Sequence, residues 1–118
     1  MRTNNSYFHY QDDPTTLTVW KDRPGRIRIM ALLGNGKHED ARRYFYKKYH
    51  PHEDISTKRI LQLDMDPYNF HLENLIAISP RTMNCLLNNH LLSTSSKHNL
   101  LAIKALELEE TIKDLGSL

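Results

Sequence analysis

Alternating apolar and polar positions predict two strands in the first third of the chain. The segment "TLTVW" (16–20) alternates and is rich in β-branched residues. The segment "RIRIMALL" (26–33) carries Arg26 and Arg28 on one face and isoleucines on the other, as a half-buried strand does. A Pro-Gly pair between the two segments predicts a turn. We therefore expect a small N-terminal antiparallel sheet with 26–33 at its centre, preceded by residues 1–15 as a flexible arm or a short edge strand.

A basic helix is expected next, over residues 39–50. Glu39 and Asp40 suit its N-terminus, two lysines and a histidine suit its C-terminus, and Pro51 ends it. Because arginines and lysines crowd this helix, it is either a solvated face or part of a basic surface that contacts phosphates. Residues 16–57 would then comprise the N-terminal sheet and this helix.

A hairpin followed by a helix is predicted for residues 58–90. Its strands are "KRILQL" (58–63) and "NLIAIS" (74–79), and the segment between them is built from Asp, Asn and Pro, which are turn residues. Pro80 fits the first position of a short helix, with Ser79 as its N-cap. The order strand, turn, strand, helix defines a ββα unit.

The last predicted helix, residues 97–115, has apolar residues at intervals of four and three. These are Leu101, Ala105, Leu108, Ile112 and Leu115. The favoured interpretation is that this stripe covers the domain's own core. The alternative is a seam that binds a partner protein or a second copy, which would give a homodimer through this helix.

The length and composition of the 118 residues fit a single domain, and the order of the predicted strands and helices makes its fold class α+β. Apolar residues make up 39% and charged residues 25%, as in folded proteins, and a chain of this length buries one modest core. The net charge of +2 permits nucleic-acid binding without requiring it. The single cysteine, Cys85, excludes an internal disulfide and favours a reducing compartment. The first residues lack the apolar core of a signal peptide, and no apolar run reaches membrane-spanning length, so we expect a cytoplasmic protein.

The hairpin carries the most specific motif of the chain, "RILQLDMDPYNFHLENLIAIS" (59–79). Together with "RRYFYKKYHPHED" (42–54), it resembles the HNH endonuclease family in the small form found in phages. The resemblance covers about residues 26–115 and implies the ββα-metal fold and an origin in a phage or mobile element. The cytoplasm in question would then be that of the host cell.

The resemblance places the family's catalytic positions on residues without the necessary chemistry. The general base falls on Gln62, the preceding metal ligand on Leu61, the motif asparagine on Asn74, and the last ligand on Met83, or on Asn84 after a one-residue shift. A glutamine accepts no proton near neutral pH, and a leucine has no lone pair for a cation. The resemblance therefore implies the fold without a complete nuclease site, and no cofactor is expected.

An active enzyme with a rearranged site is the alternative. It would be a DNA-nicking endonuclease dependent on Mg²⁺ or Mn²⁺. Its ligands would come from side chains near the hairpin, namely Asp64, Asp66, His50, His52 and His71. The two aspartates would equally well bond the backbone of the turn, and the histidines would equally well lie at the surface.

Without cleavage, the protein would act by binding. Duplex DNA would contact a basic surface made of Arg26, Arg28, Arg42, Arg43, Lys47, Lys48, Lys58 and Arg59. A host protein is the other class of partner, and by analogy the chain would then inhibit a host defence system such as CRISPR. No membrane partner is expected.

Overall fold

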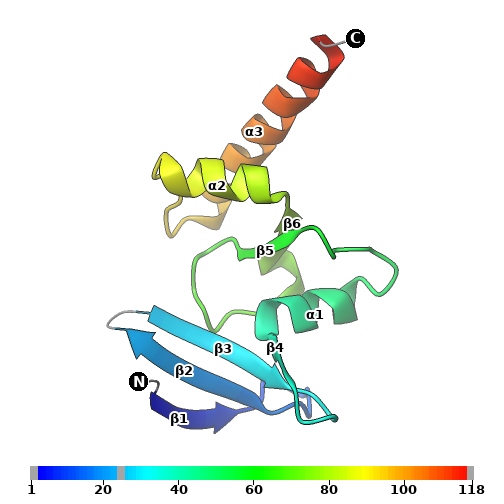
Figure 1. Cartoon of the computed structure of the whole chain (residues 1–118). Coiled ribbons are helices and arrows are strands. Elements are labelled where there is room, and N and C mark those ends of the chain that lie inside the picture. The colour runs from blue at the N-terminus through cyan, green and yellow to red at the C-terminus, as the bar shows by residue number, and fades with distance from the viewer. Residues whose placement is uncertain (1–2, 24–25, 117–118) are drawn as a thin grey trace.

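The fold is α+β, as the sequence predicts, and the computed structural model describes residues 3–23 and 26–116 (Figure 1). The strands are β1 (Thr3–Phe8), β2 (Leu17–Arg23), β3 (Arg26–Leu32), β4 (His38–Asp40), β5 (Arg59–Gln62) and β6 (Leu75–Ile78). The helices are α1 (Ala41–Tyr49), the 3-10 turn η1 (Leu72–Asn74), α2 (Pro80–Asn88) and α3 (Ser96–Gly116). The first four strands form one antiparallel sheet, and β5 and β6 form the hairpin.

The N-terminal sheet has the order β1-β2-β3-β4. Of the two alternatives for the N-terminus, the structure has the edge strand, because residues 3–8 pair with β2. The sequence indicates only a turn after β3, yet residues 38–40 form β4 against the end of β3. The strand β4 consists of three polar residues, so it carries no hydrophobic alternation from which it could be predicted.

Helix α1 lies against the sheet and begins two residues later than expected. Asp40 is the last residue of β4 and also the N-cap of α1, since its side chain accepts a hydrogen bond from the Arg42 amide at 2.9 Å. The buried face of α1 contains Ala41, Phe45 and Tyr46. The arginines and lysines of the helix therefore lie toward its outer side and its ends.

The hairpin lies between two clusters of buried side chains. The sheet core contains Leu17, Val19, Ile29, Ala31, Ala41, Phe45, Tyr46, Ile55, Ile60, Phe70 and Leu75. The helical core contains Leu61, Leu63, Ile78, Leu86 and Ile103. Successive residues of a strand point to opposite faces, so Ile60 enters the sheet core while Leu61 and Leu63 enter the helical core. The hairpin thereby joins the N-terminal sheet to helices α2 and α3 (Figure 1).

Helix α3 contradicts the interpretation that its apolar stripe covers the core. Four stripe residues are 60–64% exposed, namely Leu101, Leu108, Ile112 and Leu115, and Ala105 is exposed as well. The helix packs through a different face, on which Asn99 and Ile103 are both fully buried. Its C-terminal half projects away from the rest of the molecule (Figure 1). No helix within the described ranges is long and apolar enough to cross a membrane.

Candidate nucleic-acid interface

The Asn74 side chain connects the two ends of the hairpin loop. Its Oδ1 accepts a hydrogen bond from the Asp64 amide at 3.0 Å, and its Nδ2 donates to the Asp64 carboxylate at 2.9 Å and to the Asn69 carbonyl at 3.0 Å. The side chain is only 7% exposed. This geometry holds the two ends of the loop together, which explains the asparagine by folding alone.

Asp64 and Asp66 shape the turn of the loop. Asp64 accepts hydrogen bonds from the Asp66 amide at 2.9 Å and from Asn69 Nδ2 at 2.8 Å, and Asp66 accepts one from the Tyr68 amide at 3.0 Å. Burial alone would raise the pKa of the Asp64 carboxyl, but hydrogen bonds from two asparagine side chains and from backbone amides lower it overall. Because three donors already bond its oxygens and its pKa is lowered, Asp64 is poorly suited to accept a proton from water.

Most residues at the positions that the resemblance assigns to catalysis pack in the core or bond the loop. Gln62 is 7% exposed, and its Nε2 donates to the Asn69 carbonyl at 3.0 Å. Leu61 and Met83 belong to the helical core or pack against it, and Asn84 is exposed on α2. Gln62 and Leu61 differ in their surroundings because successive residues of a strand point to opposite faces. Gln62 points toward the sheet side and Leu61 toward the helices.

The candidate metal ligands do not come together. Asp64 and His71 line an open cavity of about 640 Å³, His50 lies beside the ring of Tyr46 with centroids 4.4 Å apart, and His52 is exposed at the end of α1. Among residues 3–23 and 26–116, no three His, Cys, Asp or Glu side chains are grouped so that they could hold a metal ion.

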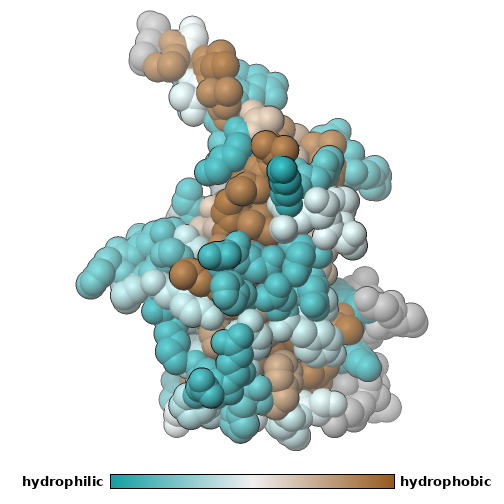
Figure 2. All heavy atoms as spheres, turned by 180° about the vertical axis from the view of Figure 1, so that it is seen from behind, coloured by the Kyte–Doolittle hydropathy of each residue, from teal (hydrophilic) through white to brown (hydrophobic). Residues whose placement is uncertain are grey.

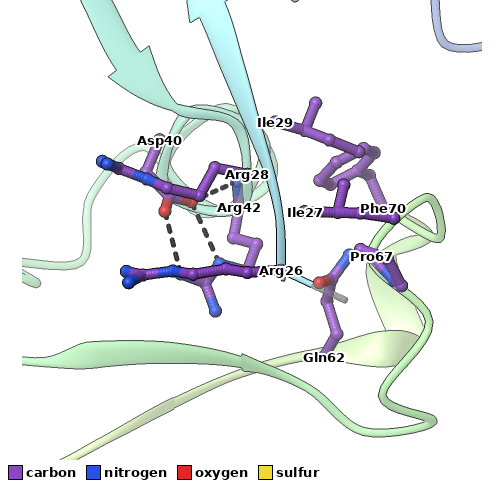
Figure 3. Close-up of a pocket in the computed structure, with 9 residues that line it drawn as sticks. All are labelled: Arg26, Ile27, Arg28, Ile29, Asp40, Arg42, Gln62, Pro67 and Phe70. Atoms are coloured by element: carbon purple, nitrogen blue, oxygen red, sulfur yellow. Dashed lines mark hydrogen bonds and ion pairs between the residues drawn. The ribbon is translucent and has the colours of Figure 1, made fainter. Parts of the chain in front are cut away.

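Three of the predicted basic residues line a second cavity, of about 470 Å³, between the sheet and the hairpin. Arg26 and Arg28 come from the exposed face of β3, and Arg42 comes from the first turn of α1. Figure 3 shows the ends of the Arg26 and Arg28 side chains on the same side as Asp40, while Gln62, Pro67 and Phe70 lie on the opposite side. The lining residues are Arg26, Ile27, Arg28, Ile29, Asp40, Arg42, Gln62, Pro67 and Phe70. Three arginines and one aspartate give this lining a formal charge of two positive.

The pairing of Arg42 with Asp40 orients one of these arginines. Nε donates to Oδ1 at 3.0 Å and one terminal nitrogen donates to Oδ2 at 2.8 Å, which is the two-pronged geometry typical of arginine and carboxylate. Hydrogen bonding to Asp40 raises the pKa of Arg42. Burial alone would raise the pKa of Asp40, but the hydrogen bonds and the charge of Arg42 lower it overall. The carboxylate therefore remains ionised and fixes the guanidinium beside the cavity.

The other predicted basic residues have different environments. Arg43 donates to the carbonyls of Lys58 and Ile55 at 2.7 and 2.8 Å, so it holds the segment between α1 and β5. Lys47 is paired with Glu39, and Lys48 with Asp13. The side chains of Lys58 and Arg59 are exposed. The eight residues are therefore not one uniform surface, and the cavity gathers three of them.

Asn99 has a positioning role that the sequence does not reveal. Its Nδ2 donates to the carbonyls of Leu63 and Ser93 at 2.6 and 2.7 Å, and its Oδ1 accepts from the Ser93 amide at 2.9 Å. This fully buried side chain links α3 to the end of β5 and to the segment before α3. The only sequence signal is an amide among apolar residues in "HNLLAI", which does not identify its partners.

Comparison with known proteins found no match to the chain among protein-family models, curated proteins or solved structures. The resemblance to HNH endonucleases thus remains a prediction from the residues of the hairpin.

Proposed function

We propose that this chain is an HNH-like protein that binds nucleic acid through the cavity between β3, α1 and the hairpin loop, and that it does not cut its ligand. One observation carries the proposal. The position that the resemblance gives to the catalytic base, Gln62, borders a cavity that is lined by Arg26, Arg28 and Arg42.

The chemistry of the lining supports a phosphate-bearing ligand. A guanidinium presents several N–H donors in a plane and matches the oxygens of a phosphate. Asp40 orients Arg42, so this side chain is already partly ordered before a ligand binds and loses less conformational freedom on binding. A cavity of about 470 Å³ falls within the size range of ligand pockets and can admit a phosphate with its sugar.

The contacts of the loop residues support the proposal that the ligand is not cut. The Gln62 amide donates to the Asn69 carbonyl, and the Leu61 side chain packs in the helical core. Neither residue can accept a proton from water near neutral pH, and the Leu61 side chain has no lone pair for a cation. Asn74 and Asp64 are engaged with each other, so they support the loop on which a ligand would rest.

The test is fluorescence anisotropy with a labelled DNA duplex over about 50 to 200 mM salt. We expect salt-dependent binding that is weakened about tenfold or more in the double variant Arg26→Gln with Arg28→Gln. The slope of the logarithm of affinity against the logarithm of salt concentration should also decrease by roughly one for each phosphate-binding arginine replaced. Lys97→Gln with Lys113→Gln is the matched control, since it removes the same charge from the exposed side of α3.

Two outcomes would refute this function. Absence of any DNA binding at low salt would point to a protein partner, such as a host protein. If both double variants lose the same DNA affinity, the affinity depends only on the net charge of the protein, and the cavity does not bind the DNA.

Cleavage is tested separately with supercoiled plasmid and Mg²⁺ or Mn²⁺. We expect the plasmid to remain intact. Metal-dependent nicking that disappears in Asp64→Ala or Asn84→Ala would instead establish the active endonuclease. Asn84 is the cleaner probe because it is exposed and outside the loop network.

A further inference from the structure

Helix α3 has two apolar faces, and only one of them packs within the chain. The inner face contains Ile103, which is fully buried, with Ala102 and Leu106 packed against the same cluster. The outer face is the stripe of Leu101, Ala105, Leu108, Ile112 and Leu115, in which the four larger side chains are 60–64% exposed. Figure 2 shows apolar side chains continuing onto the projecting end of the molecule. The fold of one copy therefore does not account for the outer face.

The spacing of this outer face is that of a helix-pairing seam. Intervals of four, three, four and three residues match the core positions of a heptad repeat. A narrow stripe of this kind fits the seam between two helices, whereas a helix that packs on a globular core has a broader apolar face. Here the packing on the core is already provided by the opposite side of α3.

The charges beside the stripe match those of a second copy of the same helix. Lys104 and Glu109 flank the stripe on opposite sides and are five residues apart. In a parallel pair, side chains with this separation face each other across the seam, so the Lys104 of each copy would meet the Glu109 of the other, which gives two ion pairs. An antiparallel pair brings flanks of the same kind together, so Lys104 and Glu109 would not face each other. Within one chain, the contacts of Lys104 with Glu107 and of Glu109 with Lys113 are both 3.7 Å long and exposed, so they are weak.

We propose that α3 pairs in parallel with α3 of a second copy of this chain, through the stripe and two Lys104–Glu109 ion pairs. The seam from Leu101 to Leu115 spans fourteen residue steps, or about 21 Å. So short a seam buries less surface than a standard stable interface, and the dimer is in concentration-dependent equilibrium with the monomer. The pairing is independent of nucleic-acid binding, because the cavity and the stripe are built from different elements.

The first experiment measures sedimentation velocity from about 1 µM to 1 mM protein, a range that covers weak association. We expect the weight-average sedimentation coefficient to rise toward that of a dimer. Leu108→Glu with Ile112→Glu should stay monomeric throughout while its circular dichroism is unchanged. Lys97→Glu is the control, since it makes the same change in charge on α3 but outside the stripe, and it should dimerise normally. A wild-type protein that is monomeric over the whole range would overturn the proposal.

The second experiment tests the ion pairs by mixing two variants. Lys104→Glu and Glu109→Lys should each dimerise at least about tenfold more weakly than wild type, because each places like charges across the seam. An equimolar mixture of the two restores opposite charges across the seam and should recover association. If the mixture associates no better than its components, the ion pairs are not part of the interface.

The third experiment decides the orientation of the helices. In a Cys85→Ser background, Leu115→Cys places one thiol near the end of α3. A parallel pair brings the two thiols together, and mild oxidation should yield a disulfide-linked dimer on a non-reducing gel. An antiparallel pair separates them by the length of the seam and gives none. Adding Leu108→Glu with Ile112→Glu should abolish cross-linking and so excludes random collision as its cause.

Discussion

The hairpin loop and the outer face of α3 differ in which side chains point inward: polar ones in the loop, whereas apolar ones on α3 point outward. In the loop, residues 63–74, polar side chains turn inward and bond the backbone, with Asn74 and Asp64 at the centre. On α3, leucines and an isoleucine turn outward while an asparagine, Asn99, is fully buried. Residue type alone therefore does not determine whether a side chain is buried or exposed. The loop is explained by the folding of one chain, whereas the outer face of α3 is not.

The largest expected effect separates the two faces of α3. Ile103→Ala should lower the free energy of unfolding by about 3 kcal/mol, because it leaves a cavity in the helical core. Leu108→Ala on the exposed stripe should change it by less than about 0.5 kcal/mol. Urea unfolding followed by circular dichroism, at a protein concentration low enough to keep the chain monomeric, measures both values. Similar losses for the two variants would show that the stripe is covered within one chain.

An intermediate effect is expected in the loop. Asn74→Ala removes one acceptor and two donor contacts and leaves the Asp64 amide unpaired, so it should destabilise the fold by about 2 to 3 kcal/mol. The matched control Asn84→Ala, on the exposed side of α2, should cost less than about 0.5 kcal/mol. The same unfolding assay applies. A negligible loss for Asn74→Ala would mean that the loop is not held by this side chain.

The smallest expected effect is a pH dependence centred on Asp64. Its folded-state pKa lies below the unfolded value, so its contribution to stability is complete above the unfolded pKa and is lost as the pH falls through the folded pKa. Asn69→Ala removes one of the donors that lower this pKa, so the folded value should rise toward that of an ordinary aspartate. The loss of stability on acidification from about pH 5 should then become smaller for this variant. Titration of the Asp64 carboxyl by NMR, with unfolding curves at each pH, measures both quantities. An unchanged carboxyl pKa in Asn69→Ala would exclude this hydrogen bond as a cause.

Local patterns are sufficient to predict most of the element order. Alternation in residues 26–33 predicts β3, the acidic pair Glu39 and Asp40 predicts the start of α1 to within two residues, and the N-cap Ser79 predicts the start of α2. The contacts of Asp64 and Asp66 are predictable as backbone bonds of a turn, since short acidic side chains reach nearby amides. These features depend on residues close together in the chain.

The candidate site is less predictable because it depends on distant segments. The cavity joins β3, the start of α1 and the hairpin loop, and the sequence does not tell that Arg43 turns to the Ile55 carbonyl while Arg42 borders the cavity. The two residues are neighbours on one helix, and their partners come from different parts of the fold. Charge alone therefore groups eight residues that the structure separates.

The sequence by itself determined strands β2, β3, β5 and β6, the turns between them and the N-cap of α2, because the hydrogen bonds and steric preferences that produce them act over a few residues. It also determined that α3 would have an apolar stripe with heptad spacing. Only the tertiary structure decided that the stripe would remain exposed. A helix with apolar residues on two faces can pack through either, and the choice depends on which face fits the helical core and allows Asn99 to reach the Leu63 carbonyl.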